Sequence, residues 1–347
     1  MTNQSVLRVP VQLGDGCAIS DDIAYVTCFP DAITDEVAFT RLFAFNAATT
    51  EKWFHHDLNG HRVVSVCLRR AHGSISRAAC ALSEEGMVEL ANTSGQTLEQ
   101  IPGAGLRTGS RGLGAMRRIR EIDQHLLACG AGNQVYLRQT DGWTALDRQL
   151  VSLARATPST LAGGLHASHG ILSDDALLAL TNDMGGLGGF DDIGGMSLSD
   201  LYVCGLAGAL WHWNGNDWTR LESPSDDHLH CLHAVSDQRI WVCGHNGTLL
   251  LGNRKQGFQS VPGADGSRHY WSVREFGGVV YLGSANGLLT YDNGHLARLL
   301  LPRETRPPVV QAIDSTDNVL WVVTDRSIAR MNDGKWEIFL HPDNIAT

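Results

Sequence analysis

The side chains best suited to metal chemistry lie in residues 226–233, which read Asp-Asp-His-Leu-His-Cys-Leu-His. On a β-strand alternate residues share a face, so His228 and His230 could hold a metal ion together with a carboxylate. The same pattern fits a strand whose polar side chains line a wet channel or bond to neighbouring carbonyl groups. We expect this second arrangement, with no metal and no cofactor, and keep His228 and His230 as the candidate ligands.

Motifs for nucleophilic or metal-assisted catalysis are missing from the chain. It contains no GxSxG and no HExxH sequence, and no CxxC pair. The eight cysteines lie in apolar runs such as LLACG, LYVCG and IWVCG, which is typical of reduced, buried thiols. Paired aspartates lie in turns or at helix starts, where local hydrogen bonds explain them. The sequence therefore predicts a protein that is not an enzyme.

The net charge and the hydropathy of the chain restrict the classes of partner that it could bind. The formal net charge is -10, with an isoelectric point near 5.8, whereas nucleic-acid binders usually carry a basic excess. We therefore expect no nucleic-acid partner and a basic protein partner. The first eleven residues do not resemble a signal peptide, and no apolar run is long enough to cross a bilayer. These features favour a cytoplasmic protein without membrane contact.

An internal repeat decides the fold class. Aligning LYVCGLAGALWHW, IWVCGHNGTLLLG, VYLGSANGLLTYD and LWVVTDRSIARMN spaces four aromatic residues by 39, 40 and 40 positions. These four are Tyr202, Trp241, Tyr281 and Trp321. A second column follows about sixteen residues later and contains Trp218, Phe258, Leu296 and Trp336. A period near 40 with four strands per repeat is typical of a propeller blade.

Asn-Gly turns and less regular copies of the blade sequence extend the repeat over the rest of the chain. Asn246-Gly247 and Asn286-Gly287 fit tight turns between the second and third strands, because both residue types accept positive φ. Extending the template backwards adds LLACGAGNQVYLRQTDGW and two degenerate copies. We predict an all-β chain, a single monomeric β-propeller of seven four-stranded blades with one long inserted loop. The predicted blades cover about 12–58, 62–102, 116–148, 189–222, 228–262, 269–300 and 309–340 of residues 1–347, with the insertion at 149–188.

The blade sequence FDDIGGMSLSDLYVCGLAGALWHWNGNDWTRL resembles those of photosystem-II assembly-factor and sialidase-like propellers. The similarity extends from Phe190 to about Phe339. The Ser-x-Asp-x-Gly-x-Thr-Trp box of sialidases is absent. The resemblance therefore implies an architecture and no sialidase chemistry, because one fold serves many functions.

The inserted loop is the first candidate partner surface. It contains an expected helix start at Asp174 and Asp175, followed by a glycine-rich acidic stretch. That stretch holds Asp183, Asp191 and Asp192. Long ordered loops in compact domains often carry function, so these five aspartates are predicted to bind a partner. A tolerated surface insertion is the alternative, and a decayed eighth blade is disfavoured by the glycines.

A glycine-rich basic segment at residues 103–120 is the second candidate surface. It lacks Gly-Lys-Ser/Thr, and Thr108 interrupts a GxGxxG pattern, so a phosphate-binding loop is disfavoured. Arg107 and Arg111, with Arg117 and Arg118 beyond them, could form a basic rim on the same face as the insertion. A solvated loop is the alternative.

Three functions fit these observations. The first is a non-catalytic, protein-binding propeller, such as an immunity protein that neutralises a basic toxin. The second is a sugar-active or lactonase-like enzyme with a site at the central channel. It would need Asp123, Asp192, His230 and Glu275 to converge. The third is an assembly factor of the kind that the resemblance implies, although no export signal is apparent.

Overall fold

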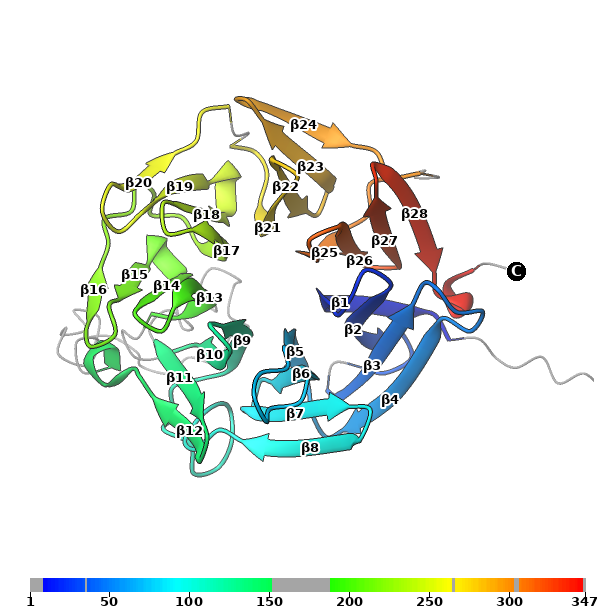
Figure 1. The fold of residues 1–347 in the computed structure, drawn as a ribbon, viewed down its shortest axis with the longest axis horizontal. Coiled ribbons are helices and arrows are strands. Elements are labelled where there is room, and N and C mark those ends of the chain that lie inside the picture. Colours follow the sequence, from blue (N-terminus) through cyan, green and yellow to red (C-terminus); the bar gives the residue numbers. More distant parts are fainter. Residues whose placement is uncertain (1–8, 35, 152–187, 264–265, 303–305, 346–347) are drawn as a thin grey trace, which may run out of the picture.

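We describe a computed structural model of the chain, covering residues 9–34, 36–151, 188–263, 266–302 and 306–345. Seven separate four-stranded antiparallel sheets stand around a central axis, like the blades of a propeller (Figure 1). Within each sheet the strands follow chain order from the centre outwards. The predicted all-β, seven-bladed propeller is confirmed.

The N-terminal half of the chain forms three blades. The first contains β1 (Val11–Ala18), β2 (Ile23–Pro30), β3 (Phe39–Asn46) and β4 (Trp53–Asn59). The second contains β5 (Val63–Arg69), β6 (Ala78–Ser83), β7 (Met87–Asn92) and β8 (Gly95–Gln100). The third contains β9 (Met116–Ile122), β10 (His125–Gly130), β11 (Gln134–Gln139) and β12 (Gly142–Ala145).

The C-terminal half forms four blades, to which three 3-10 turns are attached. The fourth contains β13 (Phe190–Ser197), β14 (Asp200–Gly205), β15 (Leu210–Trp213) and β16 (Trp218–Arg220), with η1 (Leu206–Gly208). The fifth contains β17 (Leu229–Ser236), β18 (Arg239–Gly244), β19 (Leu249–Asn253) and β20 (Gly257–Ser260), with η2 (His245–Gly247). The sixth contains β21 (Tyr270–Phe276), β22 (Val279–Ser284), β23 (Gly287–Asp292) and β24 (His295–Leu299). The seventh contains β25 (Val310–Ser315), β26 (Val319–Thr324), β27 (Ser327–Asn332) and β28 (Lys335–Leu340), followed by η3 (Pro342–Asn344).

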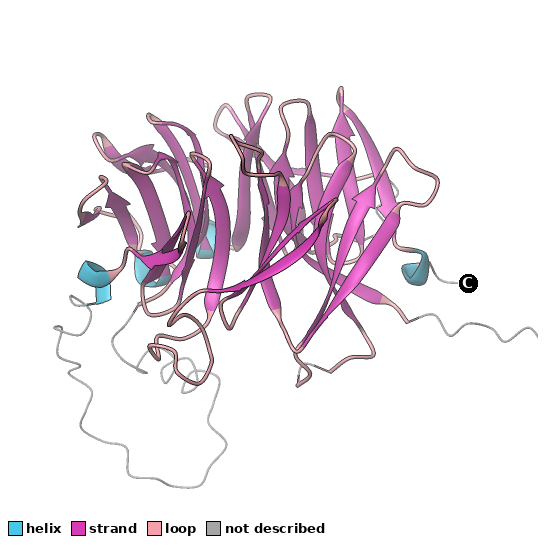
Figure 2. Cartoon of the chain, turned by 60° about the horizontal axis from the view of Figure 1, so that its bottom comes forward, coloured by secondary structure: helices cyan, strands magenta, loops and turns pink. Residues whose placement is uncertain are grey.

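The strands run between two faces of the ring (Figure 2). Connections between consecutive blades, and turns between second and third strands, emerge on one face, which we call the connection face. The other hairpins emerge on the opposite face. None of the helices in the described ranges is long and apolar enough to span a membrane.

The two columns of the repeat differ in how deeply their side chains are buried. Tyr202, Trp241, Tyr281 and Trp321 occupy the second strands of their blades and are all buried. The second column lies on the outer strands, where Trp218 is 2 % exposed but Leu296 and Trp336 are only half-buried. The outermost strands therefore contribute unequally to the core.

Apolar packing between blades holds the ring together. One buried cluster lies at each of the seven junctions between neighbouring blades, including the junction of the seventh blade with the first. All eight cysteines are buried and free, as the apolar runs predict. Burying this apolar surface at every junction favours the closed ring over separate blades.

The ring closes without exchanging a strand between its first and last blades. Asn344, in η3, accepts a hydrogen bond from the Val11 N–H at 2.8 Å and donates one to the Val11 carbonyl at 2.9 Å. The Trp321 indole donates to the Ser20 carbonyl at 3.1 Å. The Leu13 N–H also donates to the Asp325 carbonyl at 2.8 Å, so side-chain and backbone hydrogen bonds together link the two ends of the ring.

Candidate functional site

A cluster of imidazoles and a carboxylate lies at the connection face, at the inner edges of the fourth and fifth blades. Asp191 lies at the start of β13, His228 directly precedes β17, and His230 lies at the start of β17. The Asp191 Oδ2 atom is 2.9 Å from His230 Nδ1 and 2.5 Å from His228 Nε2. Arg117 on β9 forms an ion pair with the other oxygen of Asp191. The carboxylate therefore joins three consecutive inner strands.

Two more histidines extend the cluster outwards. His245, in η2, lies with its ring centroid 4.5 Å from that of His230, and His269 is 4.5 Å from His245 on the far side. Burial and the neighbouring imidazoles, with His230 the largest contributor among them, lower the pKa of His245 to about 4. Burial alone would raise the pKa of Asp191, but its contacts with His228 and His230 and the charge of Arg117 hold it well below its usual range.

A second cluster of charges fills the channel beneath these histidines. Asp192, which is fully buried, lies 3.0 Å from Arg120 and 3.5 Å from Arg118, and Arg118 also pairs with Asp15 at 3.2 Å. On the opposite side Arg274 pairs with Asp314 and lies 3.1 Å from His233 Nδ1. Burial and the charge of Arg274 lower the pKa of His233 to about 3.

One small cavity lies in the described part of the channel. It measures about 140 Å³ and is bordered by Arg120, His233 and Arg274. Sites for small molecules usually measure roughly 300 to 1,000 Å³. This cavity is therefore smaller than a typical small-molecule site.

The predicted position of Asp191 and Asp192 in an exposed acidic loop is wrong. Both belong to the innermost strand β13 and are 9 % and 0 % exposed, with their charges compensated by arginines and histidines. The glycines before Phe190 suggested a loop, but the strand begins directly after them. Asp174, Asp175 and Asp183 lie outside the described residues.

The predicted basic rim is divided between two environments. Arg107 is exposed in the connection from β8 to β9. Arg111, in the same connection, binds the fully buried Asp147 at 2.5 Å and the Tyr136 hydroxyl at 2.7 Å, so it fastens the connection to the third blade. Arg117 and Arg118 belong to β9 and pair with carboxylates in the channel, so the prediction of a continuous rim is wrong.

The four residues of the alternative enzyme do not converge. Asp123 is exposed in the hairpin between β9 and β10. Glu275 accepts hydrogen bonds from Arg239 and from the Trp241 indole, at 2.6 and 2.7 Å. Asp192 and His230 lie on adjacent inner strands, but Asp192 is held by Arg118 and Arg120.

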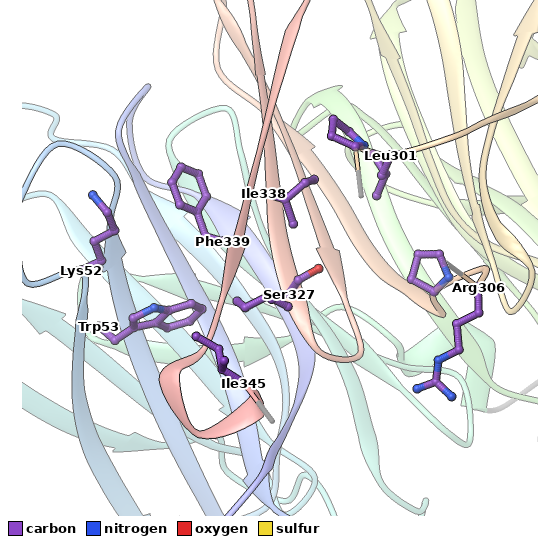
Figure 3. Close-up of a pocket in the computed structure, with 11 residues that line it drawn as sticks. Lys52, Trp53, Leu301, Arg306, Ser327, Ile338, Phe339 and Ile345 are labelled. Carbon is purple, nitrogen blue, oxygen red and sulfur yellow. The ribbon is translucent and has the colours of Figure 1, made fainter. Parts of the chain in front are cut away.

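A separate groove lies on the outer side of the ring, between the first and seventh blades. It measures about 460 Å³, and Trp53, Phe339 and Ile345 lie beside one another in it (Figure 3). Lys52 and Arg306 flank this apolar surface. Trp53 and Phe339 also pack on the apolar cluster of the junction, so the groove is an open edge of the core where the ring closes.

Comparisons with known proteins agree with this architecture. No family model matches the chain. It is 26 % identical to the "Immune protein Tsi7" of Pseudomonas aeruginosa over 321 residues, which are 91 % of this chain and 92 % of the relative. It is also similar to the WD40 β-propeller domain of Doa1, with a TM-score of 0.60, 12 % identity, and coverage of 97 % of this chain and 96 % of that one. For YCF48 from Cyanidioschyzon merolae the TM-score is 0.59, with 15 % identity and 98 % of both chains covered.

The structural neighbours share the fold at low sequence identity. YCF48 is a photosystem-II assembly factor, so the similarity to that group of propellers is confirmed at the level of architecture. The relative from P. aeruginosa differs from them because its sequence similarity spans nearly the whole of both chains. The chain is thus a seven-bladed propeller with a full-length relative that is named as an immune protein.

Proposed function

We propose that this chain is an immunity protein that binds a toxin protein and blocks its action without catalysing a reaction. The observation that carries the proposal is the similarity to the P. aeruginosa immune protein over 91 % of this chain and 92 % of the relative. Because the alignment covers about nine-tenths of both chains, the similarity concerns most of the propeller. Propellers commonly act as binding scaffolds, which is consistent with this role.

The channel supports a binding role over an enzymatic one. Asp15, Asp192 and Asp314 each pair with an arginine and also accept a backbone hydrogen bond. A carboxylate that acts as a general acid or base exchanges a proton with the substrate, and carboxylates engaged in this way are poorly placed to do so. The cavity bordered by Arg120, His233 and Arg274 is also smaller than a usual small-molecule site.

We place the toxin on the connection face. Leu106 is 56 % exposed in the connection from β8 to β9, next to the exposed Arg107, and Arg111 fastens that connection to the fully buried Asp147. An apolar side chain beside an arginine on a fixed backbone is a suitable contact for a protein partner. Asp174, Asp175 and Asp183, which lie outside the described residues, stay predicted contacts of the partner.

The charge of the chain favours a basic toxin. A net charge of -10 accelerates the encounter with a cationic partner at low ionic strength. We further propose that the chain acts as a monomer in the cytoplasm.

The experiment uses the product of the gene next to the one that encodes this chain. That protein is expressed in bacteria alone and together with this chain, and growth is followed in both cases. We expect growth arrest when it is expressed alone, restored growth on co-expression, and a one-to-one complex in size-exclusion chromatography. If neither neighbouring gene product is toxic, or if co-expression does not restore growth, the proposal is rejected.

A further inference from the structure

Three imidazoles in the fifth blade form a compact set of nitrogen donors. One ring nitrogen from each of His228, His230 and His245 lies within 4.8 Å of those of the other two. The ring centroids of His228 and His230 are 4.1 Å apart, and that of His245 is 5.2 and 4.5 Å from them. The three rings thus surround a common point at the connection face.

The backbone holds the three histidines in this arrangement. The His245 N–H donates to the His228 carbonyl at 2.9 Å, which ties the η2 turn to the start of β17. Asn246 continues the turn with a φ of 51°, and its side chain donates to Asp227 at 2.6 Å. The donors are therefore positioned by hydrogen bonds of the blade itself, so that little ordering would be needed when a ligand binds.

The hydrogen bonds leave a nitrogen of His230 without a partner. His230 Nδ1 bonds to Asp191, whereas its Nε2 is buried and has no hydrogen-bond partner among the described residues. Leaving a buried polar atom unpaired has a free-energy cost of roughly 1 to 3 kcal/mol. A histidine that binds a metal ion uses one ring nitrogen as the ligand and commonly donates its other ring N–H to a carboxylate. Arg117 in turn holds the Asp191 carboxylate.

We propose that His228, His230 and His245 bind one divalent transition-metal ion, with Zn²⁺ as the expected ion and Asp191 as a positioning residue. Three imidazoles suit Zn²⁺, which takes four ligands, and the fourth position would remain for water or another ligand. The site is independent of the proposed immunity function, because it requires no residue of a toxin.

The test measures Zn²⁺ binding to untagged full-length protein after treatment with a chelator. Isothermal titration with ZnCl₂ should give one site per chain, and Zn²⁺ should raise the melting temperature. His245→Gln should weaken binding by at least 100-fold, and Asp191→Asn should weaken it about 10- to 100-fold, as expected when a ligating histidine loses its carboxylate partner.

The matched control is His295→Asn, which changes a histidine exposed on the outer strand β24 and should leave the affinity unchanged. Circular dichroism establishes that each variant is folded. Because His245 lies in a turn, its variant should fold even if changes at His230 destabilise the channel. The proposal is overturned if the wild type binds no stoichiometric Zn²⁺, or if His245→Gln binds it as tightly as the wild type.

Discussion

The carboxylate of Asp192 on β13 accepts a hydrogen bond from the backbone N–H of Leu232 on β17, at 3.1 Å. It thereby joins the inner strands of two neighbouring blades while also pairing with arginines of a third. Similar bonds cross four other junctions, where a side-chain oxygen of one inner strand accepts from a backbone N–H of the next. These bonds join Asp15 to Val66, Ser65 to Ile119, Ser272 to Ile313 and Asp314 to Ala18.

Replacing Asp192 with Asn should therefore destabilise the ring. Burial alone would raise the pKa of Asp192, but Arg120 and Arg118 hold it below its usual value, so the folded protein contains the charged form. In the variant, the positive charges of Arg118 and Arg120 lose the negative charge that compensates them. We expect a loss of about 3 kcal/mol in the free energy of unfolding, measured by urea denaturation.

The control for this variant is Asp333→Asn, at an exposed turn position with a φ of 48° that asparagine also tolerates. Its free energy of unfolding should change by less than about 0.5 kcal/mol. Equal effects of the two substitutions would contradict a structural role for Asp192.

A histidine that is bonded to a buried carboxylate should make the free energy of unfolding depend on pH. The fully buried Glu89 lies 2.9 Å from His56 Nε2 and accepts from the Tyr25 hydroxyl at 3.2 Å. The bond to Glu89 raises the pKa of His56, and Asp57 adds to this effect, whereas burial opposes it. A raised pKa in the folded state stabilises the protein below the unfolded value of about 6.5, and the contribution is lost as pH rises through the folded value.

We therefore expect the free energy of unfolding to fall as the pH rises above about 6.5, and to fall less steeply in His56→Gln. Urea titrations at several pH values measure both slopes. His295→Asn, which alters an exposed histidine on β24, should retain the wild-type slope. A slope in His56→Gln identical to that of the wild type would contradict the prediction.

The two tryptophans of the outer-strand column should differ in their contributions. Trp218 is 2 % exposed, packs on the third blade and donates from its indole to the Leu146 carbonyl at 2.9 Å. Trp336 occupies the same repeat position but is half-buried. Trp218→Ala should cost about 3 to 5 kcal/mol and Trp336→Ala about 1 to 2 kcal/mol in urea unfolding. Similar losses for both would show that burial does not determine their contributions.

The thiols should be protected by the fold. Cys67 faces Cys80, and Cys231 faces Cys243, on paired strands, and all eight thiols are buried and free. Alkylation of the native protein should modify none of them quickly, whereas alkylation in denaturant without reductant should modify all eight, as measured by mass spectrometry. Fewer than eight modified thiols in denaturant would indicate a disulfide.

The blades can be predicted from the sequence because the residues that define each blade lie close together in the chain. Trp241 and Trp321 recur with the blade period, and Asn293-Gly294 and Asp333-Gly334 adopt positive φ in hairpins. The channel was harder to predict because its ion pairs join distant residues, such as Arg120 and Asp192. One signal was available: Asp191 precedes His230 by the same 39 residues that separate Tyr202 from Trp241. That spacing assigns Asp191 to an inner strand.

The proposed partner surface predicts that one exposed leucine affects toxin binding and another does not. Leu106 is 56 % exposed on the connection face, whereas Leu98 is 52 % exposed on the outer strand β8. If the toxin contacts the connection face, Leu106→Ala combined with Arg107→Ala should weaken the complex at least tenfold, because both side chains lose their contacts with the partner. Leu98→Ala should leave the affinity unchanged, since its side chain lies away from that face. Surface plasmon resonance with the purified toxin measures both affinities. If Leu98→Ala weakens binding and the double variant does not, the toxin binds the outer side of the ring instead.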